Sequence, residues 1–124
     1  EWLRQGIVSL QDERVVLNES AFIPAKDFDQ LCYYLGNHTH DHLASIAHNL
    51  LQEGEPMLER SVYYAQLSAE SVEQLRQLAT SQSMKMLNEI NKQAMELYQR
   101  DHLSNQATHR FRLGCYWYQQ DDNS

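Results

Sequence analysis

A stretch of 33 residues without glycine or proline, residues 68–100, most constrains what this chain can fold into. Ser68 is a typical helix N-cap, and Glu70 and Glu73 place negative charge in the first turns, where the helix dipole favours it. The stretch therefore predicts one long α-helix. Such a helix is about 50 Å long, whereas a compact domain of this length is only about 35 Å across. We expect the helix to bend near Ser81 or to project beyond its own chain.

Apolar and small side chains recur every three or four residues along one face of this predicted helix. The face consists of Val72, Leu75, Ala79, Ser83, Met86, Ile90, Ala94 and Leu97. Its period of about 3.67 residues favours a straight helix over a left-handed coiled coil. A second copy of the chain would cover the C-terminal half of the face most simply. We predict a homodimer whose interface contains Met86, Ile90, Ala94, Leu97 and Tyr98.

Two shorter helices are predicted before the long one. Residues 27–35 carry apolar side chains at helical spacing, and Gly36 is expected to stop that helix. The second helix covers residues 39–52 and ends before Gly54 and Pro56. The chain is thus expected to contain three helices in all.

β-Structure is predicted at the two ends of the chain. Residues 7–10 and 15–17 are short apolar strands joined by a polar turn, which is typical of a hairpin. Residues 110–118 alternate between apolar and polar side chains and predict a third strand. A third strand makes a small antiparallel sheet viable. We therefore predict an α+β fold, mainly helical, with two shorter helices, one long helix and this sheet.

The first residues suggest that the chain begins inside a larger unit. Residues 1–5 have the pattern of a helix's last turn, and Gly6 occupies a C-cap position. We expect residue 1 to be a boundary within a longer protein. A helix end, a glycine and a hairpin also occur in this order at the end of a winged helix. We predict a wing-like region at residues 1–24 and a single helical body, with the C-terminal strand, at residues 25–124.

The composition excludes several classes of function. The formal charge of −7 disfavours direct binding of a phosphate backbone by these residues. No apolar run approaches the roughly 18 residues of a membrane span. Two distant cysteines, Cys32 and Cys115, fit a reducing compartment, so we expect a cytoplasmic protein without membrane contact. Phosphate-binding loops, nucleophile elbows and paired catalytic carboxylates are missing, and we do not expect an enzyme.

Two groups of residues are candidates for binding. His38 and His42 are four residues apart and would chelate Zn²⁺ or Ni²⁺ on a helix; the alternative is a solvated polar face on which Asp41 complements the helix dipole. The second group, Glu59 and Arg60 with the neighbouring Tyr63 and Tyr64, would hold an anionic or planar ligand, or would simply brace the helices.

Several of these stretches together resemble one family. Residues 41–43, 48–50, 56–64, 67–72 and 111–118 are similar to a bacterial family of uncharacterised proteins. The resemblance implies an N-terminal region similar to a helix-turn-helix, followed by a body of this kind, and it implies no assigned chemistry. The polar and aromatic residues that carry it are Asp41, His42, His48, Asn49, Glu59, Arg60, Tyr63 and Tyr64.

The interpretation that follows is a dimerisation and regulatory portion of a helix-turn-helix transcription regulator. DNA would be contacted only through residues upstream of Glu1, and a small-molecule effector could change the spacing of the two DNA-reading modules. The alternative is a small metal- or ligand-binding protein that uses the region from His38 to His48.

Overall fold

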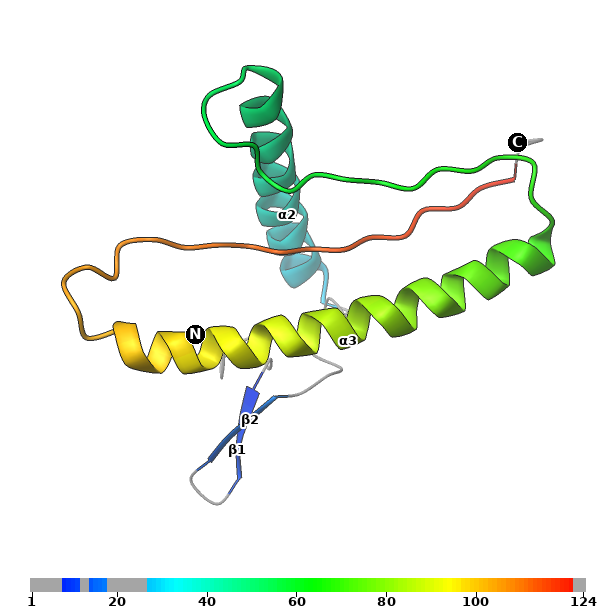
Figure 1. The fold of residues 1–124 in the computed structure, drawn as a ribbon. Helices are drawn as coiled ribbons and strands as arrows, with labels where there is room; N and C mark the ends of the chain where they lie inside the picture. The colour runs from blue at the N-terminus through cyan, green and yellow to red at the C-terminus, as the bar shows by residue number, and fades with distance from the viewer. Residues whose placement is uncertain (1–7, 12–13, 18–26, 122–124) are drawn as a thin grey trace. The chain divides into compact units, whose positions relative to one another are not determined.

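The structure, a computed structural model, describes residues 8–11, 14–17 and 27–121 (Figure 1). The elements in chain order are β1 (Val8–Gln11), β2 (Arg14–Leu17), α2 (Phe28–Leu50) and α3 (Ala69–Asp101). The chain divides into two units, Glu1–Arg60 and Ser61–Ser124, and each is considered by itself. The predicted helix end at residues 1–5 and its cap Gly6 lie outside the described residues. The predicted division near residue 24 stays a prediction.

In the first unit, β1 and β2 form a two-stranded antiparallel hairpin. Val8 lies opposite Leu17, and Gln11 lies opposite Arg14. These strands fall within a residue of the ranges expected from the apolar runs.

Helix α2 is a single helix of 23 residues. It begins after Asp27, whose carboxylate accepts hydrogen bonds from the backbone N–H groups of Asp29 and Gln30 at 2.8 and 3.3 Å. The prediction of two helices separated at Gly36 is wrong, because Gly36 lies inside the helix. A glycine within a helix costs only about 1 kcal/mol relative to alanine, and it ends a helix only when it adopts a left-handed conformation.

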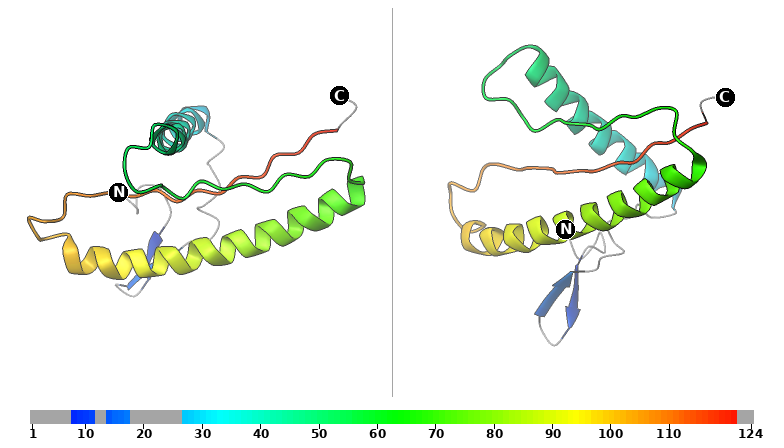
Figure 2. Two further views of the ribbon diagram at one scale, coloured as in Figure 1. Left: turned by 45° about the horizontal axis from the view of Figure 1, so that its top comes forward. Right: turned by 45° about the vertical axis from the view of Figure 1, so that its right-hand side comes forward.

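Helix α3 confirms the predicted long helix. It spans 33 residues, and the hydroxyl of its N-cap Ser68 accepts a hydrogen bond from Ser71 N–H at 3.1 Å. Ser81 lies within the unbroken helix, which curves gently along its length (Figure 2). A polar stretch with good helix-forming neighbours therefore produces no break.

A paired charge reinforces the first turns of α3. Arg76 donates two hydrogen bonds to the carboxylate of Glu73, at 2.9 and 2.6 Å, and Gln77 donates a third at 3.1 Å. These hydrogen bonds, chiefly those from Arg76, lower the pKa of Glu73 to about 2. The carboxylate thus stays charged near the positive end of the helix dipole even in mild acid.

The predicted fold class is wrong because it includes an antiparallel sheet with a C-terminal strand. Residues 102–121 turn back and run beside α3 towards its N-terminal end, and the structure assigns no strand to them (Figure 1, Figure 2). The described part of the chain is therefore mainly helical, without an antiparallel sheet that joins the hairpin to the C-terminal segment. An alternating pattern sets the two faces of a strand, but a strand also needs a neighbouring backbone about 4.8 Å away.

Candidate functional site

The end of α2 reverses the direction of the chain. Leu51 caps the helix, and Gln52 follows with a left-handed φ of 53°. Gln52 N–H donates to Asn49 O at 3.3 Å, and Glu53 N–H donates to His48 O at 3.2 Å. This pair of bonds is a Schellman motif, which satisfies the last carbonyls of the helix. Residues 55–60, called the strap below, consequently return towards the middle of α2.

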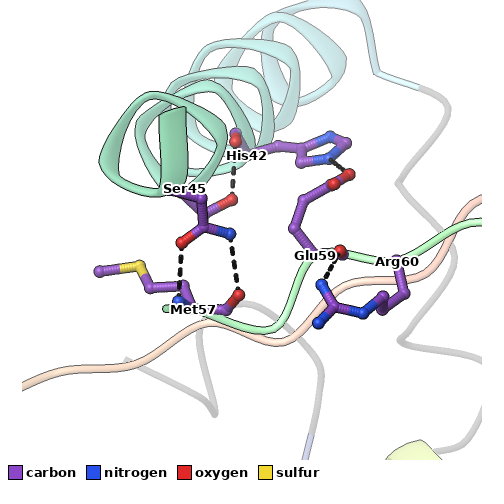
Figure 3. Close-up of polar contacts among 6 residues, drawn as sticks. His42, Ser45, Met57, Glu59 and Arg60 are labelled. Atoms are coloured by element: carbon purple, nitrogen blue, oxygen red, sulfur yellow. Dashed lines mark hydrogen bonds and ion pairs between the residues drawn. The ribbon is translucent and has the colours of Figure 1, made fainter. Parts of the chain in front are cut away.

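Asn49 fixes the strap with two hydrogen bonds to one backbone residue. Its amide nitrogen donates to Met57 O at 2.9 Å, and its amide oxygen accepts from Met57 N–H at 2.8 Å (Figure 3). A side-chain amide thus pairs with a peptide group as a neighbouring strand would. Among side chains that do not ionise, only those of asparagine and glutamine offer this donor and acceptor together in one planar group.

Two histidines of α2 hold the strap on either side of Met57. His48 Nε2 donates to Glu55 O at 2.9 Å. His42 Nε2 donates to Glu59 Oε1 at 3.2 Å (Figure 3). His48 is mostly shielded from solvent, and Glu53 Oε2 lies 4.0 Å from its Nδ1. The four hydrogen bonds from α2 to Glu55, Met57 and Glu59 are called the latch below.

The hydrogen bonds of the latch position the strap against α2. The latch contains directed hydrogen bonds, one of them between His42 and Glu59, but no nucleophile paired with a base. Within the described ranges, no three His, Cys, Asp or Glu side chains converge as a metal site. What the latch does physically is to fix the course of the chain as it leaves α2.

The structure brings some predicted site residues together and separates others. His42, His48, Asn49 and Glu59 all take part in the latch. The second predicted group is divided, since Glu59 and Arg60 belong to the first unit and the two tyrosines to the second. Arg60 donates to the carbonyl of Glu59 at 2.7 Å.

The remaining members of these two predicted groups do not belong to the latch. Asp41 accepts a hydrogen bond from His40 Nδ1 at 2.9 Å, and the ring of His38 lies 5.4 Å from that of Tyr34. Tyr63 is exposed. Tyr64 borders an open hollow of about 670 Å³ between residues 64–67 and 119–121 beside the start of α3.

Helix α3 carries a second candidate site, an apolar surface. Five large side chains keep between 38% and 56% of their area exposed, and they lie within about 120° around the helix. They are called the exposed stripe: Leu75, Leu78, Met86, Ile90 and Leu97. The adjoining side of the helix, with Met84, Leu87 and Met95, is half-buried. No residue of α3 is fully buried.

The predicted dimer residues fall partly on this stripe. Met86, Ile90 and Leu97 belong to it, whereas Ala94 is half-buried beside it. Tyr98 is exposed, and its ring stacks on that of His102 at 4.9 Å. The predicted interface itself stays a prediction.

Some latch residues could not be anticipated from the sequence. Glu55 and Met57 contribute backbone atoms, which any residue possesses. Gln52 occupies a left-handed position where glycine is usual. The one available signal was the close spacing of Gly54 and Pro56, which indicated a turn directly after the helix.

Comparison with known proteins places the chain in a family. A family model described as a family of unknown function (DUF6502) matches residues 1–124, so the chain belongs to that family. No curated protein and no solved structure matches the chain significantly. In the described ranges, no helix is long and apolar enough to cross a membrane.

Proposed function

We propose that this member of a family of unknown function is a self-association module that forms a homodimer through the exposed stripe of α3. The observation that carries the proposal is a 33-residue helix with five large apolar side chains in one line and none of its residues fully buried. Exposed large apolar side chains aligned along one face of a helix favour an interaction site on that face.

The spacing of the stripe favours a second copy of this chain as the partner. Leu75 and Leu97 lie eleven residues before and after Met86, which is close to the midpoint of α3. In an antiparallel pair centred on Met86, Leu75 would therefore meet the partner's Leu97 at both ends. A two-fold interface needs such a self-complementary surface, and antiparallel pairing also opposes the two helix dipoles.

We place this dimer in the regulatory portion of a transcription regulator. The wing-like hairpin and the resemblance to proteins with a helix-turn-helix-like region support that setting. The charge of −7 argues that DNA is read by residues upstream of Glu1. The long helix would set the distance between two DNA-reading modules, and a small-molecule effector would act by changing it. A basic helix-turn-helix upstream of Glu1 supports this setting, and a catalytic domain there contradicts it.

Sedimentation equilibrium tests the self-association. At tens of micromolar, the chain is expected to sediment with twice its mass of 14.6 kDa and to dissociate on dilution. The physical reason is that burial of apolar area drives association, at about 25 cal/mol per Å² before the entropic cost. A strict monomer at that concentration would contradict the proposal.

A further inference from the structure

The first unit brings three potential metal ligands into one neighbourhood. Because α2 is unbroken from Phe28 to Leu50, His38 and His42 lie one turn apart on the same face. At this spacing their Cβ atoms are about 5–6 Å apart, within reach of one metal ion. The strap then delivers Glu59, whose Oε1 lies 3.2 Å from His42 Nε2. The carboxylate and the His42 ring point toward each other (Figure 3).

We propose that His38, His42 and Glu59 form a Zn²⁺ site with an open fourth position. Zinc binds histidine nitrogen at about 2.0–2.1 Å and carboxylate oxygen at about 2.0–2.2 Å, so two such ligands of a tetrahedral ion are about 3.3 Å apart. The hydrogen bond between His42 Nε2 and Glu59 Oε1 holds the two atoms 3.2 Å apart, which is close to this spacing. A two-histidine, one-carboxylate set is also the chemistry that zinc prefers when a water completes its shell.

One side chain has to move for the ion to bind. In the part of the chain that the structure describes, no three such ligands already converge, and the His38 ring lies 5.4 Å from that of Tyr34. His38 is exposed, so a rotation about its Cα–Cβ bond moves the ring through solvent and exchanges its present contacts, that with Tyr34 among them, for the ion. The ion likewise replaces the hydrogen bond between His42 and Glu59: His42 Nε2 offers its lone pair to the ion, and the ring of the neutral imidazole carries its proton on Nδ1 instead.

The rest of the latch keeps Glu59 in place during this exchange. Asn49 holds Met57, and His48 holds Glu55, without help from the bond between His42 and Glu59. The strap therefore stays docked when that bond is replaced by two bonds to the ion. The site lies in the first unit, and the exposed stripe lies in the second.

Titration of the full chain with Zn²⁺ by isothermal calorimetry tests the site. One ion per chain is expected, together with a rise in melting temperature, because zinc binds only the folded arrangement of ligands. His38→Ala, His42→Ala and Glu59→Gln are each expected to weaken binding at least tenfold. Glu59→Gln preserves side-chain length and a hydrogen-bond acceptor for His42, so it reports on ligation while the latch is kept.

His40→Ala is the matched control. It removes a histidine from the same segment, but it lies about 160° around the helix from both His38 and His42 and contacts Asp41 instead. Its zinc affinity is expected to match that of the unaltered chain. The proposal is overturned if zinc neither binds nor shifts the melting temperature, if His40→Ala weakens binding as His42→Ala does, or if Glu59→Gln has no effect.

Discussion

Ile90→Glu is expected to convert the dimer into a monomer at concentrations where the unaltered chain is fully paired. Ile90 lies one turn from Met86, near the middle of the exposed stripe, and keeps 41% of its area exposed within one chain. A carboxylate there would be buried without a partner when two helices pair. An uncompensated buried charge costs about 3–5 kcal/mol, which corresponds to at least a hundredfold weaker association.

Ser81→Glu provides the control for this experiment. It adds the same charge to the same helix, but at about 180° around the helix from Ile90, on an exposed position. Sedimentation should detect a dimer for Ser81→Glu and a monomer for Ile90→Glu, with equal helix content by circular dichroism. Equal dimerisation of the two variants would show that the exposed stripe is not the interface.

Asn49→Asp is expected to release the strap from α2. The substitution keeps the shape of the side chain but replaces the amide donor by a second acceptor, which faces Met57 O at the position now 2.9 Å away. It also places negative charge near the C-terminal end of α2, where the helix dipole disfavours it. Leaving a partner unsatisfied and adding this repulsion costs about 1–3 kcal/mol.

Hydrogen exchange measures this release directly. The Met57 N–H, which donates to Asn49 Oδ1 at 2.8 Å, is expected to lose protection, and cleavage by proteases should become faster between residues 52 and 60. Asn37→Asp is the matched control, because Asn37 makes a single hydrogen bond within the helix, to Tyr33 O at 3.0 Å. If the two variants exchange alike in the strap, Asn49 does not hold it.

The sequence predicts helices best where their signals are local. Helix α3 begins directly after the expected cap Ser68 and ends within one residue of the predicted end, because cap, charge and periodicity agree. Gly36 misled the prediction for α2, since a glycine stops a helix only when the chain turns there. The C-terminal strand failed for another reason: residues 110–118 have the pattern of a strand, but pairing depends on which backbone lies alongside.

The candidate site could likewise be predicted from the sequence only in part. His42, His48 and Asn49 belong to the stretches that carry the family resemblance, and in the structure each of them bonds to the strap. Their partners on the strap could not be derived, because two of them are backbone groups of Glu55 and Met57. The reversal that brings them back depends on a left-handed Gln52, for which the residue type gives no signal.

Disulfide trapping at Met86 tests most directly whether two copies of α3 pair along the exposed stripe. Met86→Cys is made with Cys32 and Cys115 replaced by serine, and the chain is oxidised under mild conditions. A pair centred on Met86 brings the two new cysteines within the roughly 4.4–6.8 Å that a disulfide requires between Cα atoms, so a covalent dimer should form rapidly. Ser81→Cys in the same background, about 140° away around the helix, should form little. Absence of the Met86→Cys dimer, or equal trapping at both positions, would contradict pairing through this stripe.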